Sequence, residues 1–385
     1  MIIICTIFFE RVMKRYIFFL LIIPTIIVFS GCNKSDPIGS EPVAGEKIEV
    51  ILNDAAFLTD VYLRIPYTLR FREYEKEGLK LKRVTALDYY TNAELLNVEE
   101  EELNAYMIRN YSNLTLFMVP TNLKHYYLSV QIPVPLANDK PTKVFHRFEF
   151  RDTVNNKDVQ IEGAIFSPRL SESLMVIESP LKGNNNLFFS QSTMGYHFFL
   201  LFFEGDKTGT CPRFAFDNMQ VNEGMNSLFS GNPAVSESYF NYGDTVYSAT
   251  DGKVFFIRDG IPENNGNLMD HLPTTMEGVP GNNIIVDIGE GKFAFYAHFI
   301  PNTITVQPGD SVKVGQLLGR LGNSGYSGMP HLHFNLAEGN NPFMSKGIPF
   351  VFKEYTKYGT VPGQHIAPIK FYNSMSENNS VVGFE

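Results

Sequence analysis

The chain has 385 residues, of which 44% are hydrophobic and 19% charged, and its formal net charge is −9. This apolar content excludes an intrinsically disordered chain, and the acidic balance argues against nucleic acid as a partner, because phosphate binding needs a basic surface. The length favours two domains, although one large all-β domain is also compatible with it.

The start of the chain has the pattern of an export signal. A positively charged segment precedes the apolar run 16–29, which is short for a transmembrane helix, and small residues close the run before Cys32. We therefore predict a signal peptide over residues 1–31, with either Met1 or Met13 as the true start. An ordinary cleaved signal and an uncleaved anchor are the alternatives.

The residues FSGC at 29–32 resemble the lipobox of bacterial lipoproteins, with Phe29 at the position where Leu is usual. The resemblance implies a lipoprotein signal peptide and a lipid on Cys32. The protein would then be anchored in the cell envelope, on the periplasmic or surface face of the outer membrane if the cell is Gram-negative. Residues 32–46 are polar and rich in Pro and Gly, so we expect a flexible tether there.

Residues 47–165 predict a β-sandwich-like module. Apolar and polar side chains alternate along 128–134 and 144–151, and turn residues separate such runs. Alternation with a period of two is typical of strands with one buried face, and several such strands favour a sandwich. Within this module, the Glu-rich stretch 94–103 is expected to be a short helix.

Residues 166–358 predict a second, antiparallel β domain, because short apolar runs alternate there with glycine-rich turns. The Gly-Glu-Gly sequence at 289–291 joins two such runs in a plain hairpin. The connection 259–281 is long and rich in Pro, Gly and Asn, which is typical of a binding loop, a lid or a disordered segment. Residues 359–385 are expected to be a C-terminal tail.

Three short motifs carry side chains suited to metal or acid–base chemistry. His331 and His333 lie two residues apart, so on a strand both imidazoles face the same side. His298 lies at the end of an apolar strand, and Asp217 ends another, where a buried carboxylate must be hydrogen-bonded, paired or bound to metal. Each residue also has a purely structural explanation, as part of an exposed sheet face, a core or a surface turn.

Taken together, the motifs resemble the lysostaphin-type (LytM-like) zinc metallopeptidases, in order and in spacing, over roughly residues 190–355. The resemblance implies an all-β, antiparallel peptidase domain of the duplicated hybrid motif type. The motifs that carry it are RFAFD at 213–217, YGDTVYSATDGKV at 242–254, GNNIIVDIGEGKFAFYAHF at 281–299, VQPGDSVKVGQLLGRLGNSG at 306–325 and PHLHF at 330–334.

The resemblance also implies roles for individual residues. In that family one zinc ion is held by a His, an Asp and the second His of the HxH pair, which here implies Asp217 and His333. His331 would be the general base, and His298 would stabilise the developing oxyanion. The family's compact HxxxD pattern is absent, because Arg213 lies four residues before the Asp, and the upstream His197 is the expected first ligand.

The function implied by the resemblance is a zinc metalloendopeptidase that cleaves peptide cross-links in bacterial peptidoglycan, with stem peptides or cross-bridges as substrates. The module 47–165 would position the catalytic domain or bind a protein partner. One alternative is an inactive relative that regulates another cell-wall hydrolase. A second is a biotinyl or lipoyl carrier, which 306–319 also resembles, but residues 166–385 lack the Met-Lys pair usual at the modified site.

Overall fold

The computed structural model describes residues 48–72, 78–107, 125–183, 187–191, 195–204 and 207–385. These described residues form one compact unit. The predicted signal peptide, Cys32 and the predicted tether 32–46 lie outside the described residues. Within the described ranges, every helix is too short or too polar to span a bilayer.

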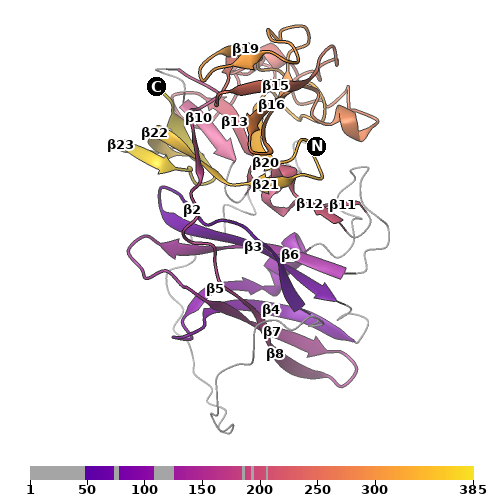
Figure 1. Ribbon diagram of the computed structural model, residues 1–385, viewed down its shortest axis with the longest axis vertical. Coiled ribbons are helices and arrows are strands. Elements are labelled where there is room, and N and C mark those ends of the chain that lie inside the picture. Colours follow the sequence, from indigo (N-terminus) through magenta and orange to yellow (C-terminus); the bar gives the residue numbers. More distant parts are fainter. Residues whose placement is uncertain (1–47, 73–77, 108–124, 184–186, 192–194, 205–206) are drawn as a thin grey trace. The chain divides into compact units, whose positions relative to one another are not determined.

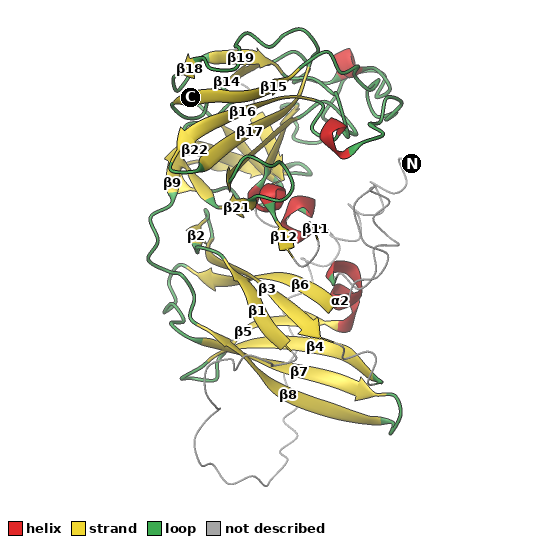
Figure 2. Ribbon diagram, turned by 45° about the vertical axis from the view of Figure 1, so that its right-hand side comes forward, coloured by secondary structure: helices red, strands yellow, loops and turns green. Residues whose placement is uncertain are grey.

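Residues 48–166 form a β-sandwich, as predicted from their alternating pattern (Figures 1 and 2). In one sheet the central strand pairs with two short strands along one edge and with a long strand along the other. These strands are β3 (Tyr62–Arg72), β1 (Ile48–Asn53), β2 (Phe57–Leu58) and β6 (His125–Pro135). The second sheet has the order β5 (Glu94–Glu99), β4 (Leu79–Asp88), β7 (Val144–Asp152) and β8 (Lys157–Phe166).

Side chains from both sheets fill the core of the sandwich. Leu69 and Phe71 of β3 and Phe148 of β7 are buried in one cluster, as expected when two sheets pack face to face. His146 of β7 is buried in the same module. Its Nε2 lies 2.8 Å from the hydroxyl of Tyr67, and its Nδ1 lies 2.9 Å from the backbone carbonyl of Ala164.

The predicted helix over 94–103 is wrong in its first half. Residues 94–99 form β5, which pairs with β4, and only then does helix α2 (Glu100–Tyr106) begin. The carboxylate of Glu102 accepts a hydrogen bond from the backbone N–H of Glu99, and such a contact satisfies a free donor at a helix start. This cap places the change from strand to helix after Glu99.

A twelve-stranded sheet organises the C-terminal half, and all its strand pairs are antiparallel except β9 with β22. Its main path is β18 (Ser311–Val312), β15 (Gly252–Arg258), β16 (Asn282–Gly289), β17 (Lys292–Phe299), β20 (Leu332–Glu338), β13 (Phe216–Val221), β10 (Leu187–Gln191), β24 (Ser380–Gly383), β22 (Phe350–Thr360) and β23 (Gln364–Ser374). Off this path, β21 (Lys346–Ile348) pairs with β20, and β9 (Met175–Ile177) pairs with β22.

Short elements complete this half of the chain. Two small antiparallel pairs are β11 (Phe202–Glu204) with β12 (Lys207–Gly209), and β14 (Thr245–Tyr247) with β19 (Leu317–Arg320). The 3-10 helices are η3 (Tyr196–Phe199), η4 (Cys211–Phe214), η5 (Ser236–Ser238) and η6 (Met276–Gly278).

The predicted hairpin at 289–291 joins β16 to β17, and the long connection 259–281 contains only η6 and turns apart from one isolated bridge. The expected C-terminal tail, 359–385, is instead part of the sheet. It supplies β23 and β24, and β24 lies between β10 and β22 with Val381 and Val382 fully buried. Because these valines fill the core, the end of the chain is structural.

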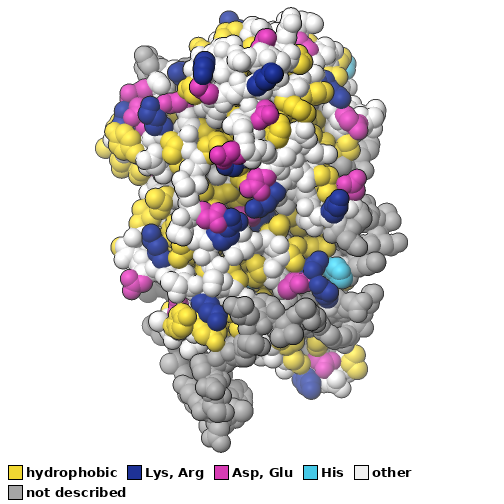
Figure 3. Space-filling model, in the orientation of Figure 1, with side chains coloured by type: hydrophobic (Ala, Val, Ile, Leu, Met, Phe, Trp, Pro, Cys, Tyr) yellow, Lys and Arg dark blue, Asp and Glu magenta, His cyan; other side chains and the backbone are white. Residues whose placement is uncertain are grey.

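Charged side chains of both signs are interspersed on the face shown in Figure 3. Lys and Arg lie beside Asp and Glu over much of the described surface in that view. Phosphate binding needs a continuous basic surface, and the described side chains on this face do not provide one.

Candidate metal centre

Strand register brings Asp217 and His333 together. Asp217 of β13 is the direct partner of His333 of β20, and Ala297 of β17 pairs with His333 from the other side. Directly opposed residues in an antiparallel pair present their side chains to the same face. The expectation that Asp217 ends a strand is wrong: it is the second residue of β13, because residues 211–214 form η4, which has a proline in its first turn.

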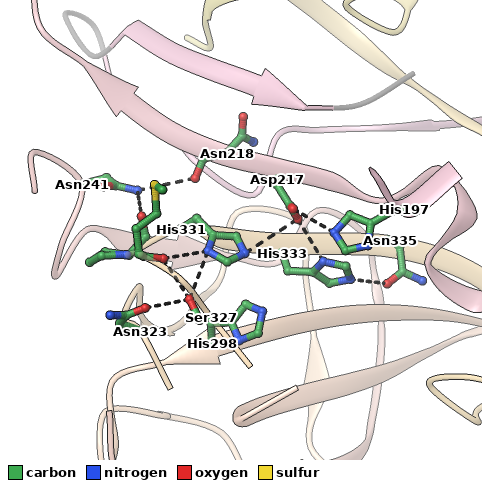
Figure 4. Close-up of polar contacts among 12 residues, drawn as sticks. His197, Asp217, Asn218, Asn241, His298, Asn323, Ser327, His331, His333 and Asn335 are labelled. Atoms are coloured by element: carbon green, nitrogen blue, oxygen red, sulfur yellow. Dashed lines mark hydrogen bonds and ion pairs between the residues drawn. The ribbon is translucent and has the colours of Figure 1, made fainter. Parts of the chain in front are cut away.

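The third member of the group comes from η3. His197 Nε2 lies 2.8 Å from Oδ2 of Asp217, and His333 Nδ1 lies 2.9 Å from Oδ1 of the same carboxylate (Figure 4). The potential ligand atoms of the three residues all lie within 4.8 Å of one another. Their side chains are 13–19% exposed. The structure therefore brings together the three residues that the sequence predicts as ligands.

The donor set fits a zinc ion. Two imidazole nitrogens and one carboxylate oxygen are typical of catalytic zinc sites. Ligand atoms at 2.0–2.1 Å from a tetrahedral ion are about 3.3 Å apart, so the contacts of 2.8 and 2.9 Å need only a small outward shift.

The surroundings of His333 also favour a cation. The amide of Asn335 donates to the backbone carbonyl of Cys211 at 2.9 Å, which turns its oxygen toward Nε2 of His333, 3.1 Å away. Both ring nitrogens of His333 therefore face oxygen acceptors. If Nε2 carries the proton, the lone pair of Nδ1 points at the Asp217 carboxylate, and a cation between them relieves the repulsion.

Two further histidines stand beside this group with the same tautomer. His331 Nδ1 lies 2.9 Å from the carbonyl of Met329, and His298 Nδ1 lies 2.7 Å from the carbonyl of Ser324. A carbonyl only accepts, so each neutral ring holds its proton on Nδ1 and has a lone pair at Nε2. The two ring centroids are 4.6 Å apart, and His331 Nε2 lies 3.9 Å from Oδ1 of Asp217.

Peptidase family M23 is the family whose model matches this chain, over residues 238–344. The chain carries an M23 peptidase domain. The matched segment includes His298, His331 and His333, whereas His197 and Asp217 precede it. No curated protein matches the chain.

Solved structures similar to the chain include several M23 proteins. A variant of the catalytic domain of the prophage-encoded M23 protein EnpA from Enterococcus faecalis is 19% identical, covers 43% of this chain and 92% of its own, and has a TM-score of 0.26. A putative peptidase M23 from Pseudomonas aeruginosa is 18% identical over 71% and 87% of the two chains, with a TM-score of 0.24. The catalytic domain of lysostaphin from Staphylococcus simulans is 23% identical over 31% and 85%, with a TM-score of 0.21.

Burial and charge shift the pKa values of two groups in the candidate metal centre. Burial raises the pKa of Asp217, but the charges of His197 and His331 and hydrogen bonds from His197 and His333 outweigh burial and hold this pKa well below its usual value. Burial, followed by the charges of His331 and His333, lowers the pKa of His298 well below its usual value. His298 also has a left-handed backbone with φ of 71°, a strained conformation that is common at functional sites.

A mostly apolar pocket adjoins the histidines of the candidate metal centre. His197, His298 and His333 line it together with Phe202 and Phe343, whose rings meet edge to face at 5.3 Å. Concave, apolar pockets with a few convergent polar groups are typical ligand sites. Its wall also includes Tyr196, Leu200, Val279 and Tyr326.

Sequence reasoning missed Asn335 and the pocket walls. Asn335 lies two residues after His333 on the same strand, so strand periodicity could have placed it on the same face. The walls come from separate segments and carry no shared pattern. His271 in the connection 259–281 and His365 in β23 belong to no metal-binding group that the described residues form.

Proposed function

We propose that the protein is a zinc metalloendopeptidase that cleaves peptide cross-links of bacterial peptidoglycan. The observation that carries the proposal is the meeting of His197, Asp217 and His333, with the lone pairs of two more imidazoles beside them. The M23 match over 238–344 supports the peptidase class.

His197, Asp217 and His333 would hold the zinc ion. Zinc in such a site supplies Lewis acidity and lowers the pKa of a bound water to about 7. Three protein ligands leave an open position for that water. The intact donor set favours an enzyme over an inactive relative that regulates another hydrolase. A relative that binds no zinc has no need of two histidines and an aspartate that converge on one point.

His331 is the general base of the proposed mechanism. Its Nδ1 proton is held by the Met329 carbonyl, so Nε2 is free to accept a proton from the attacking water. The resulting imidazolium then has an N–H at Nε2, and this proton can pass to the departing amine. The 3.9 Å between Nε2 and Asp217 Oδ1 places the charge that forms beside a carboxylate.

His298 can stabilise the oxyanion only in its protonated form. A neutral His298 donates from Nδ1 to Ser324, so its Nε2 is an acceptor and offers nothing to a negatively charged oxygen. Burial and the charges of His331 and His333 lower the pKa of His298, so this donor would form only when a proton is transferred to Nε2 during the reaction. The centroids of the His298 and His331 rings are 4.6 Å apart, which places the two imidazoles beside each other. With His298 protonated, one ring accepts and the other donates, as acyl transfer requires.

The proposed substrates are stem peptides or cross-bridges of peptidoglycan, reached from the cell envelope through a lipid on Cys32. The lipobox-like FSGC and the polar tether 32–46 support this location. The pocket beside the histidines would hold the part of the substrate peptide next to the scissile bond, with Phe202 and Phe343 as the apolar wall of the pocket.

Digestion of purified peptidoglycan tests the proposal. The full chain in detergent is incubated with the polymer, with zinc or with a chelator, and the fragments are separated by mass. We expect cross-linked dimers to shorten only with zinc, and Asp217→Asn to abolish the effect. Cleavage of glycan chains, or peptide cleavage that persists in chelator, would contradict the proposal.

A further inference from the structure

We propose that the β-sandwich (residues 48–166) positions the zinc ligand His197. It does so through Arg213, whose side chain contacts both the sandwich and the short helix that carries His197. Asp54 and Ser129 of the sandwich and Arg213 are then positioning residues, which act on zinc binding without touching the ion. The proposal rests on the proposed function only in taking His197 as a ligand.

Arg213 connects the sandwich to the metal centre through buried polar contacts. Its side chain is fully buried. Its Nε donates to Oδ2 of Asp54 at 2.8 Å, and Nη1 donates to Oγ of Ser129 at 3.0 Å. A buried guanidinium is tolerated only when paired and hydrogen-bonded, and both of these side chains belong to the sandwich.

The same guanidinium fixes the short helix that carries His197. Nη1 of Arg213 also lies 3.3 Å from the backbone carbonyl of Phe198, and the guanidinium carbon lies 4.2 Å from the centre of the Phe198 ring. Phe198 is fully buried and directly follows His197 within η3. Arg213 itself lies in η4, three residues before β13 and its Asp217.

His197 needs such support from its backbone. His333 is oriented by a hydrogen bond from its second ring nitrogen to Asn335, which is the usual way in which a ligand histidine is held. Nδ1 of His197 is buried, and the described residues offer it no hydrogen-bond partner. The position of this ring therefore depends on η3, and η3 depends on Arg213.

A second ion pair between the same parts of the chain provides a matched control. Arg64 of β3 donates from Nε to Glu377 at 2.9 Å, which also joins the sandwich to the C-terminal half. Glu377 also accepts from the hydroxyl of Thr59 at 2.6 Å, and its N–H donates to Asp60 at 3.1 Å, so this pair is held by partners other than those of Arg213. Loss of either pair weakens the attachment of the sandwich, but only loss of the Asp54 pair releases η3.

The test compares Asp54→Asn with Glu377→Gln in the full chain purified in detergent. Zinc affinity is measured by competition with a chromophoric chelator. We expect Asp54→Asn to weaken zinc binding at least tenfold, about the effect of losing an outer-shell partner, and Glu377→Gln to change it less than twofold. Equal affinities in the two variants would overturn the proposal.

Hydrogen exchange of the metal-free protein tests the same idea without zinc. The N–H of Leu200 donates to the carbonyl of His197 at 3.1 Å. We expect this amide to exchange faster in Asp54→Asn than in Glu377→Gln, and equal rates would overturn the proposal. If the wild-type chain binds no zinc, the proposed function fails while this measurement still decides the role of Arg213.

Ser129→Ala covers the case in which Asp54→Asn does not fold. It removes one hydrogen bond from Arg213 and leaves the buried charge pair intact. We expect a twofold to fivefold loss of zinc affinity and faster exchange at Leu200, with the thermal midpoint close to that of the wild type. Unchanged affinity and exchange in this variant would contradict the positioning role.

Discussion

Replacement of Asn335 by alanine tests how His333, a proposed zinc ligand, is held. Asn335 is 2% exposed, its oxygen lies 3.1 Å from Nε2 of His333, and its amide donates to the Cys211 carbonyl at 2.9 Å. Removing such an outer-shell partner lowers metal affinity by about 10–100-fold, which corresponds to about 1.4–2.7 kcal/mol. Loss of the hydrogen bond to the Cys211 carbonyl adds about 0.5–1.5 kcal/mol of destabilisation.

The matched variant is Asn335→Asp, which keeps an oxygen acceptor for Nε2 of His333 but cannot donate to the Cys211 carbonyl while ionised. Both variants are titrated with zinc against a chromophoric chelator, and their unfolding in urea is followed without metal. We expect both to be less stable than the wild type, but only Asn335→Ala to lose zinc affinity. Wild-type affinity in Asn335→Ala would refute the idea that this hydrogen bond orients the ligand.

Three further predictions concern the base, the sandwich and the pocket. His331→Ala should lower kcat by about 10²–10⁴-fold while the zinc content, measured by atomic absorption, stays that of the wild type; a matching loss of zinc would contradict its role as a base. Burial lowers the pKa of His146 to about 4, so below pH 6.5 only the unfolded state takes up this proton. Stability should therefore fall from pH 6.5 to pH 4, by about 3 kcal/mol, and urea midpoints of His146→Gln should show a flatter pH profile if this explanation holds. Phe343→Ala should raise KM for a peptide substrate more than it lowers kcat, since it removes an apolar wall from the pocket; an unchanged KM would exclude this wall from substrate binding.

Much of the fold follows from local patterns in the sequence. Alternation along 144–151 places Phe148 in the core of the sandwich, and Gly289-Glu290-Gly291 marks the hairpin between β16 and β17. The sequence predicts a helix over 94–103, but pairing with β4, which no local pattern reveals, makes residues 94–99 a strand. Tertiary pairing also decides that residues 359–385 form strands and not a tail, because β24 pairs with β10 and β22.

The candidate site divides in a similar way. The two-residue spacing of His331 and His333 is visible locally, although only His333 lies within β20. The register that sets Asp217 opposite His333 joins positions 116 residues apart, and only a family resemblance could suggest it. Arg213 stands where a compact HxxxD pattern would place a ligand, and its pairing with Asp54 over 159 residues leaves no local trace.

Zinc content tests the central claim most directly. The full chain is purified in detergent, dialysed against buffer with a trace of zinc and assayed by mass spectrometry of the metal, beside an Asp217→Ala variant. We expect one zinc ion per wild-type chain and less than a tenth of that in the variant. An equal metal content in the two proteins, or none in the wild type, would contradict the assignment of His197, Asp217 and His333 as a zinc site.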